Sequence, residues 1–111
     1  ATRGACELLK EVTGVPAISI SLGGGMTQTA LFNQILADVL GRPINVASTP
    51  HASAVGAALI AGASLTGADL AAMAAIAHEG KTIDPKPGIT DEYEDHYGRW
   101  LEAQERLKGL L

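Results

Sequence analysis

The sequence is poor in cysteine and lacks long apolar runs, the features needed for disulfide bonds and for membrane insertion. It contains one cysteine, Cys6, among 111 residues, and neither a secretory signal nor a long apolar span. A single cysteine cannot form a disulfide within the chain, so a reducing, cytoplasmic setting is expected. A membrane helix needs about 20 consecutive apolar residues, so no membrane partner is expected. Cys6 is expected to pack as a small apolar residue.

Positive charge is also scarce. The chain has 8 Lys and Arg residues against 12 Asp and Glu residues, which gives a net charge of −4. The basic residues are scattered, whereas proteins that bind nucleic acid or anionic membranes usually carry a basic patch. Neither partner is therefore expected.

The first half of the chain has the pattern of a βαβ unit. Residues 15–22 (VPAISISL) are apolar at nearly every position, which is typical of a strand covered on both faces. Residues 30–40 have apolar side chains at helical spacing, followed by Gly41 as a cap and by Pro43. Residues 44–48 (INVAS) predict a second strand. The sequence therefore predicts an α/β fold.

Helices dominate the rest of the sequence. Amphipathic or small-residue patterns predict them at the N-terminus, over residues 52–63, and from Thr90 onward. Thr66 and Asp69 predict a capping box that opens another helix, which Gly80 closes. Only two strands are clear, and two strands do not form an independently stable sheet. We therefore expect the missing strands to come from elsewhere and the chain, residues 1–111, to be part of a longer protein.

Three consecutive glycines, Gly23, Gly24 and Gly25, join the first strand to the helix. They favour either a tight turn or a cradle for phosphate groups at a helix N-terminus. A Walker loop is excluded because no lysine follows the glycines. A dinucleotide fingerprint fits poorly because Gln28 stands where its third glycine belongs.

Other catalytic and metal-binding patterns are missing. His51, His78 and His96 lie far apart in the sequence, and no paired cysteines accompany them, so no metal site is expected in this chain. No nucleophile elbow with its Ser, His and Asp partners is present. The sequence therefore predicts no catalytic residue of its own.

Several linked motifs in one order are more specific than the glycines alone. "GGGMTQTALFNQILADVLGRPINV" followed by "HASAVGAALIAG" resembles the C-terminal region of the FGGY family of carbohydrate kinases. The resemblance is close over residues 18–62 and looser afterwards, where "GKTIDPKPGITDEYEDHYGRW" is similar to the family's usual ending. Two positions depart from the family pattern: Gln28 replaces asparagine or serine, and His51 replaces glutamate.

The resemblance implies part of an actin-like, ribonuclease-H-like ATPase domain with few strands and several helices. It implies an ATP-dependent enzyme that transfers a phosphoryl group to a sugar or polyol. In that family Gly23, Gly24 and Gly25 correspond to the turn that holds the nucleotide phosphates, and Gln28 to a position near the adenine.

The same resemblance places the catalytic aspartate, the magnesium ligands and the sugar pocket outside this chain. The expected partners are the nucleotide, the sugar or polyol, and the remainder of the parent kinase, while homo-oligomerisation stays open. The isolated chain is expected to be inactive. Two alternatives remain: a module of another actin-like or heat-shock-type ATPase, and a structural fragment that binds nothing.

Overall fold

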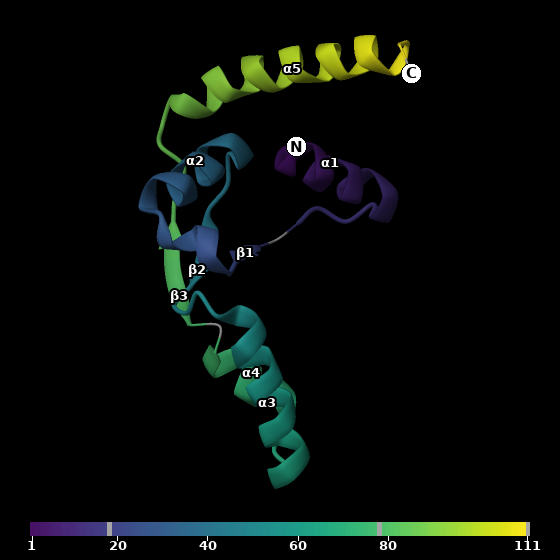
Figure 1. Ribbon diagram of the computed structural model, residues 1–111. Coiled ribbons are helices and arrows are strands. Elements are labelled where there is room, and N and C mark those ends of the chain that lie inside the picture. The colour runs from purple at the N-terminus through teal and green to yellow at the C-terminus, as the bar shows by residue number, and fades with distance from the viewer. Residues whose placement is uncertain (18, 78, 111) are drawn as a thin grey trace.

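The computed structural model describes residues 1–17, 19–77 and 79–110 of the chain (Figure 1). Helices are the commonest elements of this described part, and a small sheet lies between them. In chain order the elements are α1 (Thr2–Thr13), β1 (Ile20–Leu22), the 3-10 turn η1 (Gly25–Gln28), α2 (Ala30–Leu40), β2 (Ile44–Ala47), α3 (Ala52–Thr66), α4 (Leu70–Ala77), β3 (Gly80–Ile83) and α5 (Ile89–Lys108).

The sheet has the order β1-β2-β3. β1 and β2 are parallel, with Ile20 opposite Ile44, and β3 runs antiparallel to β2, with Ile83 opposite Ile44. Helix α2 connects the two parallel strands, so the predicted βαβ unit is confirmed. β1 lies at one edge of this sheet, and the glycine turn follows its carboxyl end.

The third strand corrects the sequence interpretation. Gly80 was expected to close a helix, but it begins β3 and pairs with Ala47. A Cβ atom at Gly80 would collide with the carbonyl group of Val46, so only glycine permits this close approach of the two strands. β1 is also shorter than the predicted strand at 15–22, because pairing with β2 extends only over Ile20–Leu22.

The predicted helix boundaries are confirmed at α2 and corrected at α4. Gly41 adopts a left-handed φ of 62° after α2, as expected of a C-terminal cap. Thr66 belongs to the end of α3, where its hydroxyl donates to the carbonyl of Gly62. Asp69 alone caps α4, since its carboxylate accepts the N–H of Ala71 at 3.0 Å. α4 is described as far as Ala77, and residue 78 of the predicted helix lies outside the described residues.

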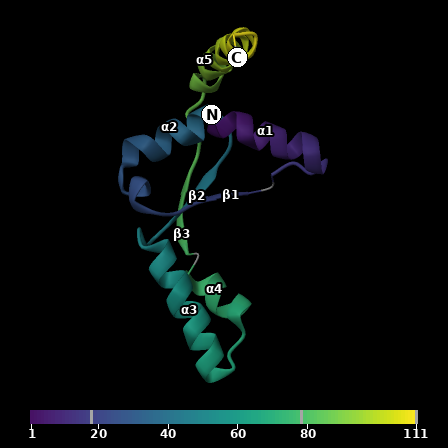
Figure 2. The same ribbon diagram turned by 45° about the vertical axis from the view of Figure 1, so that its right-hand side comes forward.

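The core of the described residues is small. Ala37 and Ile44 are fully buried and Val46 nearly so, where α2 packs on the sheet. Figures 1 and 2 show α1, the α3–α4 hairpin and α5 extending away from this centre in three directions. The radius of gyration is 17.5 Å, whereas a compact chain of this length has about 13 Å.

Helices α1 and α5 meet through a small polar and aromatic cluster. Arg3 pairs with Glu94, and its guanidinium carbon lies 4.4 Å from the centre of the Tyr97 ring. Tyr97 and Trp100 stack on each other, and a Cβ at Gly4 would lie only 3.0 Å from Trp100. The close approach of the two helices therefore depends on a glycine in α1.

Candidate functional site

The glycine turn between β1 and α2 is the candidate site, and its three glycines are structurally different. Gly24 has φ 103° and ψ 178°, a conformation that other residues rarely adopt. A Cβ at Gly23 would lie 3.3 Å from the Cβ of Ala52, so Gly23 allows the start of α3 to pack closely. Gly25 has neither constraint: its φ is not left-handed, and a Cβ there would meet nothing within 4 Å.

Hydrogen bonds from two side chains fix the turn. The hydroxyl of Thr27 donates to the carbonyl oxygen of Gly24 at 2.7 Å, and the Thr27 N–H donates to the same oxygen at 3.1 Å. The amide nitrogen of Asn33, one turn into α2, donates to the carbonyl oxygen of Thr27 at 2.7 Å. Asn33 is only 5% exposed. The turn is therefore tied to α2 from inside the protein.

Gln28 ends the 3-10 turn and its side chain is exposed. It borders an open hollow of about 520 Å³ between the start of α2 and the adjoining ends of β2 and β3. Polar and charged residues line much of this hollow: Thr27, Gln28, Asn33, Ser48, Glu79 and Lys81. Gln28 thus lies beside the glycine turn, at the edge of a space that is accessible to solvent.

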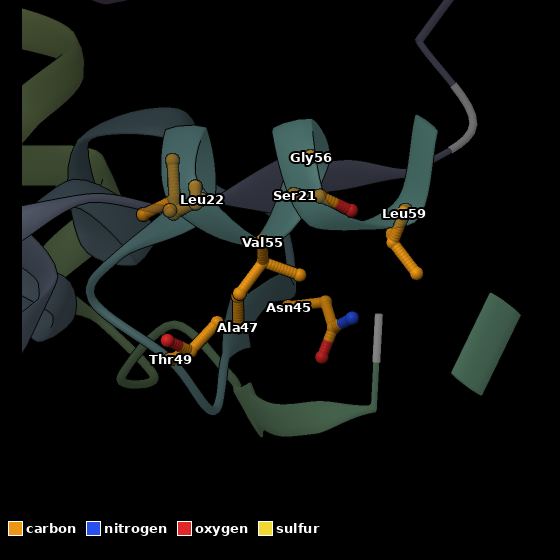
Figure 3. Close-up of a pocket in the computed structure, with 10 residues that line it drawn as sticks. Ser21, Leu22, Asn45, Ala47, Thr49, Val55, Gly56 and Leu59 are labelled. Atoms are coloured by element: carbon orange, nitrogen blue, oxygen red, sulfur yellow. The ribbon is translucent and has the colours of Figure 1, made fainter. Parts of the chain in front are cut away.

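A second hollow, of about 240 Å³, separates the sheet from α3. Figure 3 shows Val55 and Leu59 of α3 together with Asn45 and Ala47 of β2 around it. Gly23 and Gly56 also line this space, and a Cβ at Gly56 would meet nothing within 4 Å. The hollow is largely apolar and adjoins the glycine turn.

His51 immediately precedes α3, and its side chain is exposed. Its backbone N–H donates to the hydroxyl of Thr49 at 3.2 Å. Nothing in the structure explains why a histidine stands at this position.

Neither a metal-binding cluster nor a membrane-spanning helix is found in the described part of the chain. No three His, Cys, Asp or Glu side chains gather there closely enough to hold a metal ion. Within the same ranges, every helix is too short or too polar to cross a bilayer.

The comparison with known families decides the identity of the chain. Residues 1–65 match the profile described as "FGGY family of carbohydrate kinases, C-terminal domain", which is more than half of the chain. The chain belongs to the FGGY family of carbohydrate kinases. The glycine turn and α2 both lie within the matched residues. Membership of this family rules out the alternative that the chain is a module of a heat-shock-type ATPase.

Similar proteins come from several bacteria. A glycerol kinase of Pediococcus pentosaceus is 34% identical, over 92% of this FGGY chain and 20% of its own length. An autoinducer-2 kinase of Escherichia coli is 30% identical, over 96% of this chain and 21% of its own. The chain therefore spans about a fifth of the length of these relatives.

A solved structure shares the fold. The crystal structure of xylulose kinase from Rhodospirillum rubrum is similar with a TM-score of 0.76 and 25% sequence identity, over 98% of this chain and 22% of that one. The expected fold class, a mixed α/β part of an actin-like ATPase fold, is confirmed.

Sequence reasoning identified the glycine turn but not the residues that hold it. Asn33 lies within the predicted helix and Thr27 shortly after the glycines, but neither residue was predicted to hold the turn. A signal for Asn33 exists, because it lies four residues before the buried Ala37 and so on the same face of α2. A polar side chain on a buried helix face usually has a specific hydrogen-bond partner.

Proposed function

We propose that this chain is the C-terminal part of the ATP-binding domain of a sugar or polyol kinase. In this proposal the main chain at Gly23, Gly24 and Gly25 approaches the nucleotide phosphates, and Gln28 lies beside the adenosine. The whole enzyme would transfer the γ-phosphoryl group of ATP to a hydroxyl group of its substrate. A cytoplasmic location belongs to the same proposal.

The conformation of Gly24 is the observation that carries this proposal. A left-handed residue between a strand and a helical turn orients successive backbone groups differently from a regular helix start, and N–H groups at such starts bind anions. Gly25 supports it further, because neither packing nor φ requires a glycine there. A residue without a side chain at this exposed point permits a ligand to approach the main chain closely.

The surface supports the idea that the chain works within a larger protein. Its accessible surface is 7874 Å², whereas a compact protein of 11.4 kDa exposes about 5,800 Å². The difference of about 2,100 Å² exceeds what one partner contributes to a standard interface. Leu31 and Ile35, on one face of α2, remain 69% and 41% exposed. We infer that the remainder of the parent kinase covers such faces.

The described residues do not form a site that fits a magnesium ion. The described residues offer no cluster of carboxylates or histidines for a cation, and magnesium is usually bound by carboxylates together with substrate phosphates. The proposal therefore assigns metal binding, the catalytic base and the sugar pocket to regions outside this chain. The 111-residue chain alone is expected to be inactive, because phosphoryl transfer depends on all these groups acting together.

The test compares Gly24→Val with Gly67→Val in the full-length protein. Both glycines have a positive φ, and a Cβ would meet nothing within 4 Å at either position. Both variants therefore carry backbone strain, about 1–3 kcal/mol for such a residue, although the φ 103° and ψ 178° of Gly24 are less accessible to valine than the φ 68° and ψ 14° of Gly67. We expect only Gly24→Val to weaken ATP binding, measured by calorimetry, while the KM for the sugar stays the same. Equal ATP affinities in the two variants would contradict the proposal.

A further inference from the structure

We propose that Asn33 is a positioning residue for the nucleotide: from inside α2 it holds the glycine turn in the conformation that binds phosphate, through Thr27. This inference rests on the proposed function and assigns to Asn33 and Thr27 the role of holding the turn.

The hydrogen bonds form a continuous path from the helix to the turn. Asn33 donates to the carbonyl of Thr27, and the hydroxyl of Thr27 donates to the carbonyl of Gly24, each at 2.7 Å. The direction of the first bond is unambiguous, because a carbonyl oxygen only accepts, so the amide nitrogen of Asn33 must face it. Asn33 therefore acts on the residue with the left-handed φ through one intermediate residue, whose carbonyl accepts the first bond and whose hydroxyl donates the second.

The burial of Asn33 is costly for the protein. Its Oδ1 atom is buried and has no hydrogen-bond partner among the described residues. A buried polar atom without a hydrogen-bond partner is unfavourable for folding, because it has lost its contacts with water. Stability alone does not explain an asparagine here, whereas the need to hold the Thr27 carbonyl does.

The other buried polar residue of α2 provides a matched control. Asp38 is 4% exposed, and its Oδ1 accepts the side-chain amide of Gln34 at 3.0 Å and the N–H of Lys86 at 2.7 Å. The bond from Lys86 attaches α2 to the loop after β3, the bond from Gln34 lies within the helix, and neither reaches the glycine turn. Losing Asp38 removes buried hydrogen bonds from the same helix without touching the proposed path.

The experiment uses the full-length protein with Asn33→Leu, Asp38→Ala and Gly24→Val. One lost hydrogen bond corresponds to roughly a three- to tenfold change in an equilibrium constant. We expect Asn33→Leu to raise the KM and the dissociation constant for ATP by about this factor, with kcat and the sugar KM little changed. Asp38→Ala should lower the melting temperature more than Asn33→Leu but leave both ATP constants unchanged.

Thr27 supplies a second, milder pair of variants at a partly exposed position. Thr27→Val removes the hydroxyl and should weaken ATP binding in the same way. Thr27→Ser keeps the hydroxyl and should bind ATP with wild-type affinity. Suppose that Gly24→Val weakens ATP binding as expected. The positioning role is then overturned if the ATP constants are unchanged in both Asn33→Leu and Thr27→Val. It is also overturned if Asp38→Ala changes these constants as much as Asn33→Leu does. Unchanged ATP affinity in Gly24→Val as well would overturn the proposed function itself.

Discussion

The centre of the molecule and the α3–α4 hairpin are both rich in apolar residues but bury them very differently. In the centre, α2 and β2 bury Ala37 and Ile44 completely. In the hairpin, Ile60 is 60% exposed and Leu65 is 87% exposed. The comparison shows that apolar composition marks the surfaces that need a partner, and that the apolar core of the described residues lies where α2 packs on the sheet.

Helices α2 and α3 differ in what surrounds them. One face of α2 rests on the sheet, and its polar residues Asn33 and Asp38 make specific hydrogen bonds. α3 has no charged residue, and its visible neighbours are α4, through Met73 against Gly62, and the hollow beside the sheet. A helix that is apolar on all sides is normally buried on all sides. This favours an inner position for α3 in the proposed parent domain.

The largest loss of stability is expected from shortening the side chain of Ile44 in the central region. This side chain is fully buried in the middle strand, between Ile20 and Ile83 of the neighbouring strands. Ile44→Ala should lower the free energy of unfolding by about 2–5 kcal/mol, since it leaves a cavity that β-strands cannot easily close. Denaturant unfolding measures the change. Leu65→Ala, at an exposed position, serves as control and should change it by less than about 0.5 kcal/mol.

A smaller effect is expected from Asp38→Ala, which separates the central helix from the loop before α5. The N–H of Lys86 loses its acceptor, and the side chain of Gln34 keeps only its bond to the carbonyl of Asp84 at 2.9 Å. The cost should be about 1–3 kcal/mol, as for a buried donor without a partner. Asp38→Asn retains the acceptor oxygen and should unfold close to the wild type. If the alanine variant were equally stable, these bonds would not hold the loop.

The central region was also the easier part to predict from sequence. Helix α2, its cap at Gly41 and the following strand depend on local signals, namely apolar spacing, a left-handed glycine and Pro43. β3 was missed because its cause is not local: Gly80 is required by the carbonyl of Val46, 34 positions earlier in the chain. Residues 80–83 alone have too few apolar side chains to indicate a strand.

The candidate site divides in the same way. The glycine turn was visible because three adjacent glycines between a strand and a helix are rare outside turns and ligand sites. The distinct roles of Gly23, Gly24 and Gly25 were not visible, because one depends on contact with Ala52 and another on a φ angle. The path through Thr27 and Asn33 depends on the folded 3-10 turn, which sequence spacing does not specify.

The smallest change in stability of the 111-residue chain is expected from Ile60→Ser. This variant tests directly whether the apolar surface of the hairpin is covered in the parent protein. Ile60 is 60% exposed in α3, so in this chain the change should alter the free energy of unfolding by less than about 0.5 kcal/mol. In the full-length protein the proposal covers this face, and burying the same apolar area contributes about 1.5–3 kcal/mol. The variant should therefore destabilise the full-length protein by an amount in that range.

The control for this prediction is Glu102→Ser in α5, where an exposed charged side chain is replaced and little apolar area can be buried in either protein. Denaturant unfolding of both variants in both proteins gives four values, and only Ile60→Ser in the full-length protein should differ clearly from zero. If Ile60→Ser lowers the free energy of unfolding equally little in both proteins, this face of α3 stays in solvent. The hairpin would then be a free arm, because its apolar surface would have no partner in the parent kinase.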